Sequence, residues 1–261
     1  MRSLALPASL LALLLAGGTA ALAQPAGSTL DAVQSRGTLT ICTTGDYKPF
    51  TYQSPGSDAF EGIDIDLGRS LAKAIGVEPK FVKTKWSDLM ADFTAGKCDV
   101  AMGGISVTLE RQKRAFFSAP YLVNGKAPIA RCADKEKFTS VEAIDKPDVT
   151  VIVNPGGTNE RFVRQNLKNA RIEVFPDNRT IFDEVLSGKA DLMVAESVEV
   201  KLQEKLRPGL CAIRPDQPLQ YGEMGYLLPK GDVVFKAFVD QWLHLAKASG
   251  EFGRIYDANM K

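Results

Sequence analysis

The sequence has few of the residues from which metal and redox sites are built. His244 is the only histidine among 261 residues, and no Cys-x-x-Cys pair or Cys/His cluster occurs. Zinc sites in proteins need three or four such ligands close together. We therefore expect neither a metal ion nor a cofactor.

The sequence is also almost electrically neutral. Its formal charge is +1, with 32 basic and 31 acidic residues. Proteins that bind nucleic acid or an anionic membrane through charge carry a basic excess, so neither is expected as a partner. Beyond the N-terminus, no apolar run approaches the ~20 residues that cross a bilayer. Membrane insertion is therefore not expected.

The one long apolar run lies at the N-terminus. Arg2 precedes the run LALPASLLALLLA, and small residues follow, ending in Ala21-Leu22-Ala23. A charged start, an apolar core and an A-x-A site are typical of a secretory signal peptide. We expect residues 1–23 to be this peptide and residues 24–261 to be an exported, soluble protein of the periplasm.

Export permits disulfides. The four cysteines allow three pairings, and their spacing does not choose between them. Cys42 and Cys98 lie in strand-like apolar runs, which is compatible with buried thiols. Cys132 and Cys211 lie beside turn-rich segments, so we favour a bridge between these two.

Strand-like apolar runs and helix-like periodicity alternate through most of the chain. The first series alternates strand and helix over residues 38–44, 62–76, 79–84, 86–96 and 98–104. A second series alternates in the same way over 149–154, 158–169, 171–176, 178–188 and 190–196. This order predicts parallel strands with helices on the faces of the sheet. Two successive series predict an α/β protein with two lobes.

The most distinctive motifs directly follow the expected strands. In open α/β sheets, ligands bind outside the carboxyl ends of the strands, where the next helix begins. Four such ends carry TTGDYKPF (43–50), GGISVTLER (103–111), NPGGTNE (154–160) and AESVE (195–199). Facing a common cleft, these ends would form a small-molecule site between the lobes.

Two of these motifs have chemistry suited to a carboxylate. NPGGTNE turns into a helix at Thr158 and Asn159, two favourable capping residues, and free N–H groups at a helix start attract anions. Arg111 follows Ser106 and presents a planar fork that can grip a carboxylate through two parallel bonds. Each motif also has a plainer interpretation, as an ordinary capped helix and as a solvated arginine.

Aromatic and basic residues complete the candidate site. Asp46, Tyr47 and Trp86 place aromatic surface beside polar groups, as a small flat ligand requires. Aromatic side chains are, however, more often part of a core. Lys126 stands at the apparent crossover between the lobes, and most lysines elsewhere are solvated.

Together these motifs resemble those of the periplasmic amino-acid-binding proteins of ABC importers. The resemblance rests on GDYKPF, FEGIDIDL, GGISVTLER with FSAPY, NPGGTNE and GKADLMVAE, and so covers nearly all of the mature chain. It implies a type II periplasmic-binding-protein fold, in which each of two lobes is a mostly parallel sheet flanked by helices. Two hinge strands join the lobes, and the ligand lies in the cleft. Lobe one would be 24–127 plus 221–261, and lobe two 128–220.

The resemblance also implies roles for single residues. In that family, the residues at the positions of Ser106, Arg111 and Thr158 hold the ligand's α-carboxylate. An Asp at the end of the last strand of lobe two usually holds the ammonium group. This chain has Glu196 there, which is one methylene longer.

Within the family, the motifs are most similar to those of the periplasmic cyclohexadienyl dehydratases, which act on prephenate and arogenate. TTGDYKPF, LERQ, IVNPGGTNE, GKADLM and QWLH carry this resemblance. It implies a catalytic carboxyl group at Glu199, where transport proteins have an apolar residue, and site roles for Trp86, Lys126 and Asn159. The dehydratases have Thr-Asp where this chain has Ala195-Glu196, so the preference between arogenate and prephenate stays open.

Glu199 is interpreted as a general acid. Loss of CO2 and water from prephenate gives an aromatic ring, but hydroxide is a poor leaving group. A proton donor beside the hydroxyl is worth typically ~10²–10⁴-fold in rate. Burial near Glu196 would raise the pKa of Glu199 and keep it protonated. Lys126 and Asn159 would then serve the other carboxylate or the hydroxyl.

Two functions are consistent with the sequence. The first is an exported dehydratase, a carbon–oxygen lyase that makes phenylpyruvate from prephenate or phenylalanine from arogenate. The second is a periplasmic protein that delivers an amino acid to the permease of an ABC importer. The combination of Glu199 with Trp86, Lys126 and Asn159 favours the dehydratase, because a binding protein does not need it. Whether the protein is a homo-oligomer is not determined by the sequence.

Overall fold

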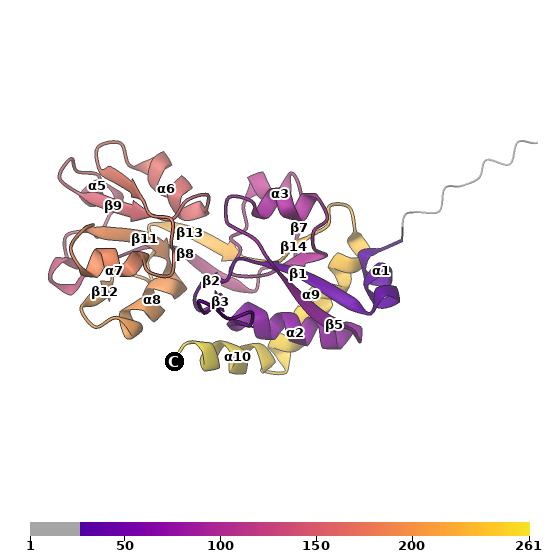
Figure 1. Cartoon of the computed structure of the whole chain (residues 1–261). Helices are drawn as coiled ribbons and strands as arrows, with labels where there is room; N and C mark the ends of the chain where they lie inside the picture. The colour runs from indigo at the N-terminus through magenta and orange to yellow at the C-terminus, as the bar shows by residue number, and fades with distance from the viewer. Residues whose placement is uncertain (1–26) are drawn as a thin grey trace, which may run out of the picture.

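The structure is a computed structural model that describes residues 27–261 (Figure 1). The expected signal peptide, residues 1–23, lies outside the described residues. Two sheets, each with its own hydrophobic cores, lie next to one another, and the chain passes from the first to the second and back (Figure 1).

The first sheet has the strand order β5–β1–β6–β14–β7. Its strands are β1 (Thr38–Thr43), β5 (Glu78–Lys83), β6 (Val100–Ala101), β7 (Phe116–Phe117) and β14 (Leu227–Leu228). β1 is parallel to β5 and β6, whereas β14 is antiparallel to β6 and β7. A small antiparallel sheet of β2 (Asp46–Tyr47), β3 (Thr51–Gln53) and β4 (Phe60–Glu61) follows β1.

Six helices belong to this lobe: α1 (Thr29–Arg36), α2 (Ile63–Ile75), α3 (Leu89–Thr94), α4 (Leu109–Gln112), α9 (Val233–Ala248) and α10 (Glu251–Asn259). The apolar residues of α2 recur at helical spacing, so that Leu67 and Leu71 are buried in one core with Ile41 of β1. α2 ends as the sequence predicts, because Gly76 takes the left-handed conformation that closes a helix.

The second sheet has the order β10–β9–β11–β8–β12, with β13 also paired to β8. β9 (Thr150–Val153) is parallel to β10 (Arg171–Val174) and β11 (Leu192–Glu196). β8 (Leu122–Arg131) is antiparallel to β11, β12 (Leu210–Ala212) and β13 (Gln220–Met224). The helices are η1 (Cys132–Asp134), α5 (Val141–Ile144), α6 (Thr158–Asn166), α7 (Ile181–Leu186) and α8 (Ser197–Leu206).

Both sheets are therefore mixed. The predicted α/β fold and its two sets of parallel strands are confirmed. The expectation of mostly parallel sheets is corrected, because the segments that enter and leave the second lobe add antiparallel strands to each sheet.

Strands β8 and β13 connect the two lobes. Leu122, at the start of β8, packs against the first core, and Ile129, near its end, is buried in the second. β13 returns alongside β8, from Gln220 opposite Lys126 to Met224 opposite Leu122. The lobe limits that we propose, 127/128 and 220/221, fall within these two strands.

A buried carboxyl group connects both strands to the first lobe. Asp64, in the first turn of α2, is 0% exposed and accepts a hydrogen bond from the Gly104 N–H at 2.6 Å. It also accepts from the hydroxyls of Tyr121 at 2.7 Å and Tyr226 at 3.1 Å. Tyr121 directly precedes β8, and Tyr226 follows shortly after β13. Burial raises the pKa of Asp64 from 3.8 to about 6, although these hydrogen bonds act against the shift.

All four cysteines form disulfides. The favoured bridge between Cys132 and Cys211 is present and joins the end of β8 to β12. The interpretation of Cys42 and Cys98 as buried thiols is wrong, because these two residues also form a disulfide. Cys42 lies in β1 and Cys98 directly precedes β6, its parallel neighbour, so the two apolar runs lie next to each other.

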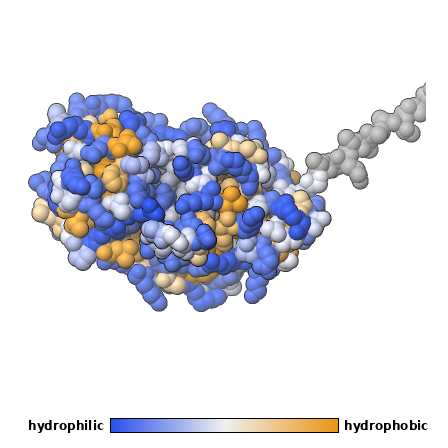
Figure 2. Space-filling view, viewed as in Figure 1, coloured by the Kyte–Doolittle hydropathy of each residue, from blue (hydrophilic) through white to orange (hydrophobic). Residues whose placement is uncertain are grey.

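Polar residues cover most of the visible surface, and apolar residues form small separate areas on it (Figure 2). Across residues 27–261, none of the helices has the length and apolar character that a membrane crossing needs.

Candidate active site

The four predicted strand ends meet between the two lobes. A small cavity lies there, in which about 20 Å³ is accessible to the centres of water molecules, and its walls include residues at the ends of β1, β6, β9 and β11. The lining residues are Tyr47, Trp86, Gly104, Ser106, Asn154, Gly157, Thr158, Asn159, Asn178 and Glu196. Six of the ten predicted site residues are among them: Tyr47, Trp86, Ser106, Thr158, Asn159 and Glu196.

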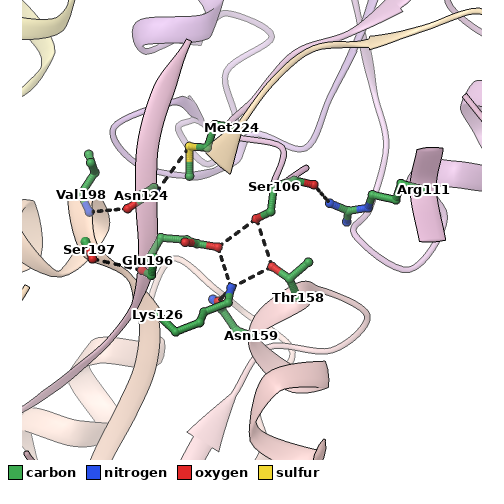
Figure 3. Close-up of polar contacts among 11 residues, drawn as sticks. Ser106, Arg111, Asn124, Lys126, Thr158, Asn159, Glu196, Ser197, Val198 and Met224 are labelled. Atoms are coloured by element: carbon green, nitrogen blue, oxygen red, sulfur yellow. Dashed lines mark hydrogen bonds and ion pairs between the residues drawn. The ribbon is translucent and has the colours of Figure 1, made fainter. Parts of the chain in front are cut away.

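A buried ion pair lies at the base of this cavity (Figure 3). Lys126 of β8 and Glu196 of β11 are direct cross-strand neighbours, and each is 4% exposed. The Lys126 Nζ atom donates to Glu196 Oε1 at 2.6 Å, to Asn159 Oδ1 at 2.6 Å and to Thr158 Oγ1 at 2.8 Å. The ammonium group thus has an acceptor for each of its three hydrogens. Burial nevertheless lowers the pKa of Lys126.

The same residues join the two lobes across the cavity (Figure 3). Ser106, from the first lobe, donates to Glu196 Oε1 at 2.9 Å and lies 3.2 Å from Thr158 Oγ1. Val198 of α8 packs into the core of the first lobe. These contacts close the cleft over the cavity.

Thr158 does not cap its helix. Gly157 is the N-cap residue of α6, and Thr158 is the first helical residue. The interpretation of Thr158 and Asn159 as capping residues is therefore wrong. Both side chains instead accept hydrogen bonds from Lys126, because the close turn at the glycines directs the first turn of α6 into the cleft.

Arg111 lies behind Ser106 and not on a solvated helix face. It is 5% exposed, and its guanidinium donates to the Ser106 carbonyl oxygen at 2.8 Å (Figure 3). Burial lowers the pKa of Arg111 to about 10, which leaves the side chain charged at neutral pH. Arg111 is not among the residues that line the cavity, but it contacts one that is, Ser106.

Trp86 and Tyr47 form the aromatic wall. Their rings pack edge to face, with centroids 5.6 Å apart. The Trp86 indole N–H donates to Asp46 Oδ1 at 3.1 Å, which fixes the ring over the cavity. From the opposite lobe, Asn178 donates to the Asp46 carbonyl oxygen at 3.0 Å. Asp46 therefore supports the wall and is not among the residues that line the ligand cavity.

Glu199 lies in the first turn of α8 and is only 1% exposed. Its Oε2 atom has no hydrogen-bond partner within the described part of the chain. Burial, with the negative charges of Glu196 and Asp46, raises the pKa of Glu199 well above its usual range. The protonated form of the carboxyl group is thus favoured.

Glu199 faces a second, adjoining cavity, in which about 110 Å³ is accessible to the centres of water molecules. Its lining residues are Asp46, Lys48, Tyr52, Asn178, Arg179, Glu199, Gln203, Leu206 and Arg207. Asn178 lines both cavities, so the two lie next to each other.

Sequence reasoning missed two asparagines of the site. Asn154 belongs to the quoted NPGGTNE motif and directly follows β9, so its position was available as a signal. Asn178 comes after β10, and the end of this strand is not among the four predicted strand ends. The side-chain oxygens of both are buried without a partner among residues 27–261. Over the same residues, no cluster of three or more His, Cys, Asp or Glu side chains could hold a metal ion.

Two lobes with a ligand cavity between their strand ends define the class of protein. The family model of the bacterial extracellular solute-binding proteins, family 3, matches residues 39–261. The chain belongs to this family.

Within the family, the chain is a homologue of an enzyme. It is 51% identical over 223 residues to the cyclohexadienyl dehydratase of Pseudomonas aeruginosa, covering 85% of this chain and 82% of that protein. The L-cystine-binding protein TcyJ of Escherichia coli is 27% identical, over 78% of this chain and 75% of that one. The predicted resemblance to the dehydratases is thereby confirmed.

Solved structures agree with this assignment. The ancestral amino acid-binding protein AncCDT-1, a precursor of cyclohexadienyl dehydratase, superposes with a TM-score of 0.82 at 35% identity, covering 90% of this chain and all of that one. A single-residue variant of the ancestral cyclohexadienyl dehydratase AncCDT-3 is 49% identical, with a TM-score of 0.58 over 91% of this chain and 98% of that one.

Proposed function

We propose that the protein is a cyclohexadienyl dehydratase, a carbon–oxygen lyase that converts prephenate to phenylpyruvate, arogenate to phenylalanine, or both. The observation that carries the proposal is the Glu199 carboxyl group, which is buried, without a hydrogen-bond partner on Oε2 in the described chain, and next to the ligand cavity. A binding protein gains nothing from such a group, because an unpaired buried carboxyl group costs stability.

The reaction needs one proton and little else. As the ring carboxylate leaves as CO2, its bonding electrons enter the ring, and the hydroxyl departs from the opposite side of the ring. Protonation of that oxygen lets water leave in place of hydroxide. Glu199 supplies the proton, since its raised pKa keeps it protonated near neutral pH.

We assign binding partners to the substrate's carboxylates and ring from the charged and aromatic side chains of the site. Ser106 and Thr158, which line the cavity, hold the side-chain carboxylate with the charge of Arg111 directly behind Ser106, and Trp86 packs on the ring. Lys126 and Asn159 are already hydrogen-bonded to each other beside Glu196. The carboxylate that is lost as CO2 thus has no dedicated cation, and this favours its departure, because ground-state binding of that group would slow the step.

The same ion pair argues against a transport role. The alternative function, delivery of an amino acid to an ABC permease, follows from family membership. In such a protein Glu196 would receive the ligand's ammonium group. Here the Lys126 ammonium already lies 2.6 Å from Glu196 Oε1.

We also propose that the protein is exported to the periplasm by the signal peptide 1–23.

The test is turnover of prephenate by the purified protein, with phenylpyruvate measured by its absorbance in alkali. Glu199→Gln keeps the shape of the side chain and removes its acidic proton, so we expect kcat to fall by roughly 10²–10⁴-fold with little change in KM. Glu204→Gln, an exposed change on the same helix, is the matched control and should be neutral. Normal turnover by Glu199→Gln would show that another group is the acid. Tight binding of an ordinary amino acid with no turnover would support the transport role.

A further inference from the structure

The proton balance of the proposed reaction leaves Glu199 in the wrong state for a second turnover. Prephenate enters with two carboxylates, and phenylpyruvate leaves with one, together with CO2 and water. The bonds broken are those from the ring to the carboxylate carbon and to the hydroxyl oxygen, and the new O–H bond takes the proton of Glu199. Each turnover therefore consumes one proton and leaves a Glu199 carboxylate.

Glu199 does not border the ligand cavity directly, because it is not among the residues that line it. The lobes meet over it through Ser106, Glu196 and Thr158. They also meet where Gly156 packs against Ser87, so closely that a Cβ atom at Gly156 would lie 2.6 Å from Ser87 Cα. The Glu199 side chain is only 1% exposed, so solvent has no direct access to it from this side while the lobes are closed.

The second cavity supplies a route from the other side. About 110 Å³ of it is accessible to the centres of water molecules, and one water needs roughly 10–15 Å³ on that measure. Leu206 on its border is exposed and Lys48 is partly exposed, so the cavity reaches the solvent. Two buried oxygens on it, Glu199 Oε2 and Asn178 Oδ1, have no partner within residues 27–261 and can bind water.

Asp46 is the one other acid among the residues that line this cavity. Burial raises its pKa, so it takes up a proton more readily than an exposed aspartate. Once Glu199 has lost its proton, two carboxylates share one small cavity. Two carboxylates that share a site favour the uptake of one proton by the pair, and the charge of Asp46 indeed raises the pKa of Glu199.

Resting on the proposed function, we propose that Asp46 and the second cavity return a proton from solvent to Glu199 while the lobes remain closed. Asp46 acts through Glu199 and does not touch the substrate. Its hydrogen bond from Trp86 places it at the junction of the two cavities.

The test separates the first turnover from later ones. Asp46→Asn keeps an oxygen acceptor for the Trp86 N–H but cannot carry a proton. With prephenate in excess and rapid quenching, the wild-type protein should form phenylpyruvate linearly. Asp46→Asn should form one equivalent rapidly and then slow by roughly tenfold or more. Acetate buffer should accelerate the slow phase alone, and Asp46→Glu should restore linear kinetics.

Two further variants guard the interpretation. Asp177→Asn removes a nearby carboxylate that is not among the residues lining the second cavity, and it should behave as wild type. Leu206→Trp narrows the mouth of the second cavity without changing a polar group, and should reproduce the burst even if Asp46→Asn fails to fold. Equal slowing of both phases, or no slowing in either variant, would overturn the proposal. Absence of any product with the wild-type protein would instead refute the proposed function.

Discussion

Asp64→Asn tests how much the ionised carboxyl group of Asp64, buried between the hinge strands, lowers the free energy of unfolding. The side chain is fully buried and receives hydrogen bonds from Gly104, Tyr121 and Tyr226. Asparagine has nearly the same shape and carries no charge. Tyrosine hydroxyls can accept as well as donate, so both can rearrange around the amide.

The size of the effect follows from the pKa. A change from 3.8 to about 6 on folding corresponds to about 3 kcal/mol between the two protonation states. Because the folded pKa is the higher one, the folded state holds the proton more tightly than the unfolded chain. The stabilisation from Asp64 is therefore complete below pH 3.8 and is lost as the pH rises to about 6.

Urea unfolding of both proteins, with disulfides intact, measures this directly. Titration of other groups cancels in the difference between wild type and variant. We expect the free energy of unfolding of the wild type, relative to Asp64→Asn, to fall by about 3 kcal/mol between about pH 4 and about pH 7. A difference that stays constant, or grows as the pH rises, would refute the reasoning.

Two further predictions concern the ion pair and the unexpected disulfide. Glu196→Asp withdraws the carboxylate from Lys126, so kcat/KM for arogenate relative to prephenate should rise on the order of tenfold; an unchanged ratio would remove Glu196 from substrate selection. Replacement of Cys42 and Cys98 by serine removes a cross-link between residues with a sequence separation of 56. Because this cross-link restricts the unfolded chain, its loss should lower the free energy of unfolding by about 2–4 kcal/mol. Unaltered urea unfolding would contradict this.

The parallel part of the fold was predictable, because buried parallel strands and amphipathic helices each leave a periodic pattern. β1, α2 and β5 lie where the sequence places them. The antiparallel strands were not predictable in the same way. β13 is only five residues long and partly exposed, and it exists because β8 offers it an edge.

In the candidate site, too, the features with a local sequence pattern were predictable, whereas those that depend on strand pairing were not. Strand-end motifs indicated which residues face the cleft, and six of ten line the cavity. Sequence reasoning did not foresee that Lys126 would pair with Glu196, since their cross-strand contact depends on the register of two strands 70 residues apart. The same limit hid the bridge between Cys42 and Cys98, which depends on β1 and β6 being neighbours.

The placement of the two disulfides has a mechanical consequence. One bridge lies within the first lobe and the other within the second, so no covalent cross-link spans the pivot formed by β8 and β13. Each lobe is held together by its own disulfide, so the flexibility between the lobes is confined to the paired strands β8 and β13. A force that pulls the lobes apart would therefore act first on these two strands as long as both disulfides are intact.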